Sequence, residues 1–196
     1  MKGLLVTAVT AGVVVGAAWI LDATNGPHGT APGEAPGEVP LAPPTVSLRE
    51  QVLHTTADKA GVAPIRRVWG VVMERGYAKG TASVIALADG TASLSLSTGG
   101  LVTGGKAYPP AHAAALKLCE QAADSLSETS AAHDFPWPAK GRVRFYVLAV
   151  DGVRVAESDI VANRADRDHD PLAPLRAAGE AVLDALKDGT NKGLLR

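Results

Sequence analysis

The sequence predicts an α+β fold with a five-stranded, mostly antiparallel sheet and flanking helices, in the order α-β-β-β-α-β-β-α. Two observations carry this prediction. Asp89-Gly90 and Asp151-Gly152 each separate two short strand-like runs, and Asp-Gly is favoured in tight hairpin turns. Segments with helical periodicity lie before, between and after these hairpins. Hairpins imply antiparallel pairing, and amphipathic helices need a sheet face to cover.

The first helix of the globular domain is predicted to begin at Ser47. The run Ser47-Leu48-Arg49-Glu50 has the S-x-x-E form of a capping box, in which Ser47 caps the helix and Glu50 reaches back to it. A modest apolar stripe follows, and Gly61 can end the helix in the left-handed conformation.

Three strands are predicted next. Arg67–Met73 is short and apolar, which suits a buried strand, and Thr81–Leu87 pairs with Thr91–Ser97 across the first Asp-Gly turn. Within 91–97, alanine and leucine alternate with serine. One face of this strand is therefore predicted to be apolar, and its serine face is predicted to be exposed or to meet something polar.

The second half of the domain contains two helices and a hairpin. A helix is predicted over Ala111–Leu126, with prolines in its first turn, where proline is tolerated. The hairpin pairs Arg142–Val150 with Val153–Glu157. The final helix begins near Pro174 and ends at Gly189, with apolar residues at helical spacing.

The N-terminal segment predicts a membrane anchor. Gly3–Leu21 carries no charge, and a helix of this length approaches the hydrocarbon thickness of a bilayer. Lys2 precedes the run and Asp22 follows it, so the positive-inside rule places the N-terminus in the cytoplasm. We therefore expect residues 1–22 to form a single-pass anchor in a bacterial cell membrane, with the domain outside the cytoplasm. A cleaved signal peptide and a buried helix are the alternatives.

Residues 23–46 are predicted to form a disordered linker, which leaves 47–196 as the globular domain. Proline and glycine dominate Asn25–Pro44, and the sequence APGE occurs twice in succession. Such a segment buries too little apolar surface to offset its ordering entropy. The alternative is a proline-rich docking ligand, although no basic residue flanks the segment to orient an SH3-type partner.

Composition excludes several classes of function. The net charge is −1, which disfavours nucleic-acid binding because that requires clustered Lys and Arg. Cys119 is the only cysteine, so an intramolecular disulfide or a Cys-rich metal site is excluded. Cys119 lies in an apolar helical run, where a small buried side chain is expected. We predict no cofactor.

A family resemblance supports the fold. The run GYAKGTASVIALADGTASLSLSTGGLVTGG, followed by GRVRFYVLAVDGV, resembles a family of bacterial hypothetical proteins with no assigned activity, over roughly residues 66–186. This resemblance implies a fold and supplies no catalytic residues. The layout is also similar to that of roadblock and profilin-like domains, which are binding platforms. It departs from the roadblock order, in which two strands precede the middle helix and three follow.

One glycine-rich loop has the form of a phosphate-binding motif. Gly100–Ala107 matches G-x-x-x-x-G-K, but Ala107 stands where a Walker A loop needs a hydroxyl group. The plain interpretation is a strand-to-helix turn that needs glycine for its backbone angles. The alternative is a looser anion site. Its residues would be Gly99, Gly100, Gly104, Gly105 and Lys106.

No metal site is predicted. Asp166–Asp170 resembles the opening of a calcium loop, but Pro171 and Ala177 stand where an EF-hand needs glycine and glutamate. The plain interpretation is a solvated loop, and a weak surface cation site is the alternative. The histidines lie singly, without the spacing of a helical metal pair.

The strand over 142–150 offers the candidate interface. Arg142, Arg144 and Tyr146 project from one face, and such residues are common at protein interfaces. The alternative places them under a helix, with their polar ends reaching outward. The leading hypothesis is a membrane-anchored, non-catalytic binding module with a protein partner. The competing hypothesis is an envelope small-ligand or anion-binding protein, or an enzyme, that uses the loop 99–105 and Lys106.

Overall fold

The computed structural model describes residues 43–160 and 170–195, which form one antiparallel sheet and the helices packed on it. The strands are β1 (Val68–Tyr77), β2 (Gly80–Leu87), β3 (Ala92–Leu96), β4 (Leu101–Val102), β5 (Ser130–Ala131), β6 (Arg142–Ala149) and β7 (Gly152–Asp159). Their order across the sheet is β4-β3-β2-β1-β6-β7-β5. The α-helices are α1 (Pro43–Leu53), α2 (Ala57–Ala60), α3 (Pro109–Asp124) and α4 (Ala173–Asn191), and two short 3-10 helices are η1 (Gly105–Ala107) and η2 (Leu126–Glu128).

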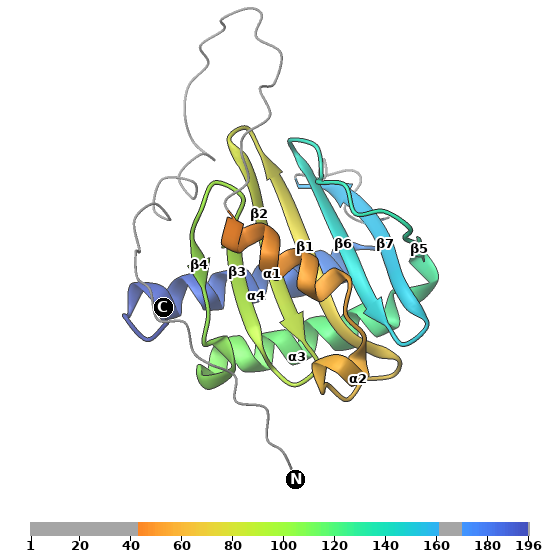
Figure 1. The fold of residues 1–196 in the computed structure, drawn as a ribbon, viewed down its shortest axis with the longest axis horizontal. Helices are drawn as coiled ribbons and strands as arrows, with labels where there is room; N and C mark the ends of the chain where they lie inside the picture. Colours follow the sequence, from red (N-terminus) through yellow and green to blue (C-terminus); the bar gives the residue numbers. More distant parts are fainter. Residues whose placement is uncertain (1–42, 161–169, 196) are drawn as a thin grey trace, which may run out of the picture.

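The α+β class, the five longer strands and both hairpins are confirmed (Figure 1). The predicted number of strands was too low, because β4 and β5 extend the sheet to seven strands. Each of these edge strands has only two residues, which is too short for an alternating pattern to be recognised. The two edge strands matter here because β5 lies beside the candidate site described below.

The predicted first helix is two helices in the structure. α1 begins at Pro43, so Ser47 lies inside it, and the predicted cap at Ser47 was wrong. Residues 43–46, predicted as linker, therefore belong to α1. A second helix, α2, has its own N-cap, because the Thr56 hydroxyl accepts from the Lys59 amide at 3.5 Å. Gly61 ends α2 in the left-handed region with φ 68°, as predicted.

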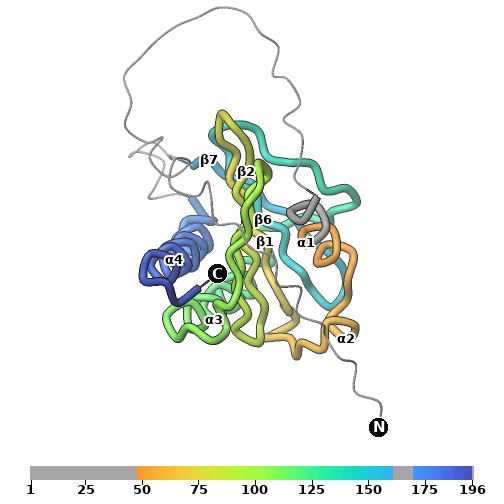
Figure 2. The backbone as a smooth tube through the Cα atoms, turned by 60° about the vertical axis from the view of Figure 1, so that its left-hand side comes forward, coloured from red at the N-terminus to blue at the C-terminus, as the bar shows by residue number. Residues whose placement is uncertain are grey.

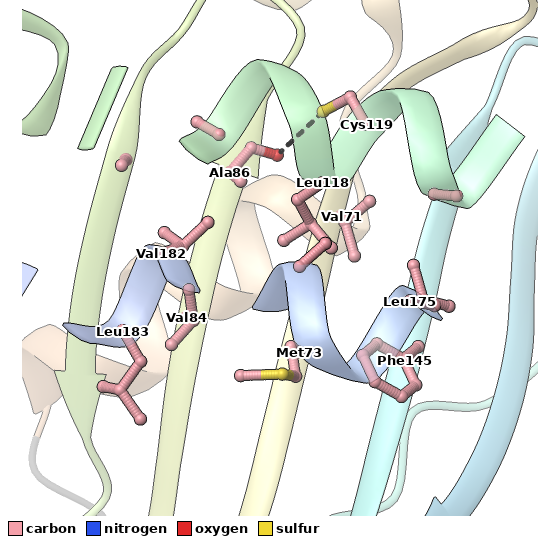
Figure 3. Close-up of a cluster of buried hydrophobic side chains, with 14 of the residues drawn as sticks. Val71, Met73, Val84, Ala86, Leu118, Cys119, Phe145, Leu175, Val182 and Leu183 are labelled. Atoms are coloured by element: carbon pink, nitrogen blue, oxygen red, sulfur yellow. Dashed lines mark hydrogen bonds between the residues drawn. The ribbon is translucent and has the colours of Figure 1, made fainter. Parts of the chain in front are cut away.

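The molecule has three layers, with the sheet in the middle. Figure 2 shows α3 and α4 on one face of the sheet and α1 and α2 on the other. On the α3/α4 face, alternate residues of β1, β2 and β6 pack against both helices (Figure 3). The labelled members of this core are Val71, Met73, Val84, Ala86, Leu118, Cys119, Phe145, Leu175, Val182 and Leu183.

Cys119 has the packing role that its helical context predicts. Its side chain is buried in the α3/α4 core, and its sulfur lies 3.9 Å from the carbonyl oxygen of Ala86. Burial raises the pKa of the Cys119 thiol to about 12. The thiolate, which is the reactive form, is therefore disfavoured at neutral pH.

The α1 face of the sheet is covered more unevenly. A second apolar cluster includes Trp69, Val72 and Leu148 of the sheet and Leu53 of α1. The segment between β5 and β6 also crosses this face. Gly76 shows how close that segment lies, because a Cβ atom at this position would be 2.2 Å from the carbonyl oxygen of Ala139.

The serine face of β3 was predicted to be exposed or to meet something polar, and exposure was wrong. Ser93, Ser95 and Ser97 are buried on the α1 side of the sheet. The Ser97 hydroxyl accepts from the Thr81 amide at 2.7 Å, so this serine forms its hydrogen bond within the sheet and not with solvent. Polar alternation here marks a buried polar surface.

The described helices do not include one long and apolar enough to cross a membrane. The predicted anchor, residues 1–22, and the linker up to residue 42 lie outside the described residues.

Candidate functional site

A row of polar side chains crosses the α1 face of the sheet from β3 to β7. Residues that pair in register carry their side chains on the same face, so the pairings of neighbouring strands define this row. The row, hereafter the polar row, consists of Ser95, Ser83, Glu74, Arg144 and Glu157. Each of its five residues comes from a different strand, so the row is a property of the assembled sheet.

The centre of the polar row is a buried ion pair. Glu74 of β1 is fully buried, and Arg49 of α1 is 2% exposed. The Arg49 Nε donates to Glu74 Oε1 at 2.5 Å, and Nη2 donates to Oε2 at 3.2 Å. The Ser83 hydroxyl donates to the same Oε1 at 3.3 Å. Both carboxylate oxygens therefore engage one guanidinium in a fork, a strong and directional arrangement.

The guanidinium of Arg49 has further partners beyond the carboxylate. Its Nη2 donates to the carbonyl oxygen of Phe135 at 2.6 Å. Its carbon Cζ lies 4.0 Å from the centre of the Trp137 ring and 5.8 Å from that of the Tyr146 ring. We call the surrounding groups, Glu74, Phe135, Trp137 and Tyr146, the arginine recess.

Burial governs the electrostatics of the recess. It raises the pKa of the Glu74 carboxyl above its ordinary value, and the hydrogen bonds and charge of Arg49 oppose this increase. An ionised carboxylate in such a place needs a paired cation. Arg49 therefore supplies the charge that makes Glu74 tolerable in the sheet.

The aromatic wall of the recess is fixed by the sheet. The Tyr146 hydroxyl donates to the carbonyl oxygen of Pro136 at 2.7 Å, and Arg144 Nη1 donates to the same oxygen at 2.6 Å. The rings of Phe135 and Tyr146 meet edge to face, with centres 5.4 Å apart. Two residues of β6 therefore hold the 135–137 segment in position.

The outer end of the polar row is also paired. Glu157 accepts from Arg142 Nε at 2.7 Å and from Arg144 Nε at 2.9 Å. Burial alone would raise the pKa of Glu157, but the hydrogen bonds from both arginines outweigh it and hold the pKa below its usual value. Glu157 is therefore a carboxylate at neutral pH and fixes both arginines.

A cleft of about 600 Å³ opens beside this end of the row. It is lined by Ser127, Glu128, Thr129, Ser130, Asp134, Pro136, Arg144, Tyr146, Val155, Ala156 and Glu157. Glu128 and Asp134 are exposed within this lining, while Tyr146 forms its buried floor. The cleft thus presents two exposed carboxylates next to the β5–β7 edge of the sheet.

The predicted interface residues are placed differently from an open surface. Arg142, Arg144 and Tyr146 do share a face, as predicted. Tyr146 is fully buried, however, and the side chains of Arg144 and Arg142 are 17% and 38% exposed. The alternative prediction placed these residues under a helix. In the structure Tyr146 and Arg144 instead donate to the carbonyl oxygen of Pro136, in the non-helical segment between β5 and β6. Only their polar ends reach toward the cleft.

The glycine-rich loop lies at the opposite edge of the sheet. Gly99 and Gly100 connect β3 to β4 with positive φ angles of 101° and 115°, and Gly104 has φ 87° before η1. A Cβ atom on Gly105 would lie 2.6 Å from the Ala92 carbonyl oxygen, so close packing requires glycine there.

Lys106, the candidate anion ligand, is engaged by an acidic neighbour. Its Nζ donates to Asp89 Oδ2 at 2.5 Å. This carboxylate neutralises the positive charge that an anion site would use. The loop geometry favours the plain interpretation, a turn that needs glycine.

Three residues of the site were not singled out from the sequence: Arg49, Glu74 and Trp137. Arg49 was considered only as part of a capping box, and the strand containing Glu74 was predicted to end at Met73. A glutamate inside an apolar strand was the available signal, because a charge at such a position calls for a buried partner.

No group of three or more potential metal-ligating side chains occurs in the described ranges. Most of the Asp166–Asp170 motif lies outside those ranges, and only Asp170 can be placed. Asp170 accepts from the Leu172 amide at 2.9 Å and pairs with Arg176 at 2.5 Å, close to the start of α4.

No protein-family model matches the chain, and neither a curated protein nor a solved structure matches it. The resemblance to a bacterial family and the similarity to roadblock layouts therefore stay predictions.

Proposed function

We propose that the protein is a membrane-anchored, non-catalytic binding module that engages a protein partner at the cleft beside β5 and β7. One observation carries the proposal: the outer edge of β7 continues past β5 into a cleft with two exposed carboxylates. The membrane anchor is the part that rests on the sequence of residues 1–22 alone.

The edge of β7 suits a peptide main chain. β5 pairs with β7 only at Val155 and Arg154, whereas β7 continues to Asp159. Among the described residues, no other strand pairs with the outer edge beyond Val155. An extended segment can add to such an edge, with main-chain hydrogen bonds giving affinity and side-chain pockets giving selectivity.

The charge of the cleft specifies the partner. Glu128 and Asp134 are exposed, while the guanidinium of Arg144 is already engaged by Glu157 and by the Pro136 carbonyl. The exposed charged side chains in the lining of the cleft are therefore both acidic. Complementary charge sets partner choice and association rate, so the partner segment should carry Lys or Arg.

The competing function, in which the loop 99–105 and Lys106 bind a small ligand or an anion, has weaker support. The Asp89 carboxylate bound to Lys106 would repel an incoming anion. In the polar row, the side chains of Glu74, Arg144 and Glu157 are each engaged in hydrogen bonds to another part of the chain. This supports a binding role rather than catalysis.

The proposal can be tested with two defined peptides. The full chain in detergent micelles is titrated with a labelled peptide of alternating lysine and valine, and with its glutamate–valine counterpart, by fluorescence anisotropy. We expect the lysine peptide to bind. We expect the Glu128→Lys/Asp134→Lys variant to bind it at least about tenfold more weakly, because the charge of the cleft is reversed.

A matched variant controls for net charge. Asp58→Lys/Asp184→Lys makes the same change in charge at exposed positions on α2 and α4, away from the cleft. This variant should bind the lysine peptide as the wild type does. Equal binding by all three proteins, or preference for the glutamate peptide, would contradict the proposal.

A further inference from the structure

We propose that the arginine recess is an exchangeable binding site for a helix-borne arginine, and that α1 of a second copy of this chain occupies it in trans. In the structure the site is filled in cis by Arg49. Exchange of an identical element between two copies makes the same contacts, so it is a low-cost route to a dimer.

The chemistry of the recess is specific for a guanidinium group. Glu74 offers a two-oxygen fork, Phe135 offers a carbonyl acceptor, and Trp137 offers a ring face at 4.0 Å. A guanidinium matches all three because it is planar, carries several donors and stacks on aromatic rings. A lysine ammonium can satisfy the charge but neither the fork nor the stacking.

The walls of the recess are held by contacts that do not involve α1. Ser83 donates to Glu74, and both Tyr146 and Arg144 donate to the Pro136 carbonyl. The close approach of Ala139 to Gly76 fixes the same segment against β1. The site is therefore organised by the sheet, and a preorganised site loses little when one identical ligand replaces another.

α1 is attached through few buried side chains. From Leu48 to Leu53, the fully buried ones are Arg49 and Leu53, while Glu50 and His54 lie toward the surface. Leu48 and Val52 are half-buried against the apolar cluster of the α1 face. An isolated helix of 11 residues is marginal in water, so α1 depends on these contacts with the sheet. The residues between α1 and α2, His54, Thr55 and Thr56, are non-helical, and the exchange would open the chain there.

The first experiment supplies α1 as a separate peptide. A labelled peptide of residues 43–53 is titrated into the full-length Arg49→Ala variant in detergent micelles, and binding is followed by fluorescence anisotropy. We expect saturable binding to Arg49→Ala. The peptide should bind the wild type at least about tenfold more weakly, because the cis helix occupies the site.

Two controls give this experiment its specificity. The same peptide with Arg49→Lys, and the Arg49→Ala/Glu74→Gln protein, should each lose the binding. Binding that survives either change would overturn the proposal. The proposal would also be overturned if the peptide fails to bind an Arg49→Ala chain that circular dichroism and cooperative melting show to be folded.

A second experiment needs no peptide and does not require either variant to be stable alone. The Arg49→Ala chain keeps Glu74, and the Glu74→Gln chain keeps Arg49, so an exchanged heterodimer regains one complete pair. We expect the mixture to show a higher melting temperature than either variant and a dimer in analytical ultracentrifugation. A mixture that melts as the sum of its two components, without a dimer, would overturn the proposal.

Discussion

Among single residues, Glu74 has the largest influence on how the α1 face of the sheet is arranged. It lies fully buried in a central strand, where an unpaired carboxylate would be very costly. A buried ion pair is often no more stabilising than a well-packed apolar pair, yet breaking it is expensive. The Arg49–Glu74 pair therefore fixes where α1 docks more than it adds net stability.

Replacing Glu74 with Gln should lower the free energy of unfolding, at the lower end of about 3–5 kcal/mol, because the buried Arg49 charge loses its buried carboxylate partner and keeps only the partly exposed Glu50 at 2.8 Å. Urea denaturation of the full chain measures this change. The matched control is Asp124→Asn, which breaks an exposed pair with Arg66 and should change the urea midpoint very little. Equal losses of stability in the two variants would contradict the cost assigned to breaking the buried Arg49–Glu74 pair.

Glu157 should make the domain sensitive to acid. Its pKa is lowered in the folded state by Arg142 and Arg144, so the stability it contributes is present above its unfolded pKa of about 4.3 and is lost as pH falls through the folded pKa. The Glu157→Gln variant should be less stable than wild type at pH 7. Its urea midpoint should also fall less between pH 5 and 3.

Glu180 provides the opposite sign as a comparison. Burial raises its folded pKa, so protonation of Glu180 favours the folded state on acidification. Removing that contribution with Glu180→Gln should make the acid-side loss of stability steeper than in wild type. If Glu157→Gln also steepens the loss, the assigned pKa direction is wrong.

The segment between β5 and β6 is the element that converts a sheet face into a recess. It brings Phe135 and Trp137 against the Arg49 guanidinium and meets β1 at Gly76. Its position depends on backbone atoms, which have no rotamers through which to relax. A change at Gly76 should therefore disturb both stability and the recess.

We expect Gly76→Ala to destabilise the domain by about 1–3 kcal/mol, because the new methyl group meets the backbone of residues 138 and 139. The change should also reduce the fluorescence anisotropy of a 5-hydroxytryptophan incorporated at position 137 alone, with Trp19 and Trp69 left unlabelled. Gly179→Ala is the control, since its methyl group meets the flexible side chain of Met73 and alanine favours the α4 helix. A larger loss at Gly179 than at Gly76 would contradict this account.

Prediction from sequence succeeded for elements with local signals. The Asp-Gly turns located both hairpins, and Gly61 was identified as a left-handed helix end. It failed where a non-local partner decides the outcome. The serines of β3 alternate as an exposed face would, but they are buried on the α1 side of the assembled sheet.

The candidate site was predicted only in part for the same reason. The shared face of Arg142, Arg144 and Tyr146 follows from strand alternation, which is local. The pairing of Arg49 with Glu74 spans 25 residues and depends on how α1 docks. The segment that buries Tyr146 also has no regular period to recognise. Neither feature can be derived from local pattern.

At the scale of the whole molecule, the two faces of the sheet have different roles. The α3/α4 face buries a continuous apolar core, whereas the α1 face carries the polar row and the cleft. Stability and binding should therefore separate in mutants. Leu118→Ala, a change in the core, should cost about 2–5 kcal/mol without changing peptide affinity at the cleft.

Cell fractionation with protease treatment tests the proposed anchor. A C-terminally tagged chain should pellet with membranes, and the tag should become cleavable once the outer face of the inner membrane is exposed in spheroplasts. A tag that stays protected until lysis would reverse the topology. A tag in the soluble fraction would contradict the anchor.

The central claim is that the cleft beside β5 and β7 binds a basic segment while the rest of the domain acts as scaffold. Hydrogen exchange of the full chain, with and without the lysine–valine peptide, tests it most directly. We predict added protection confined to residues 127–130 and 155–159. Protection at residues 99–106, or no protection anywhere at saturating peptide, would contradict the account.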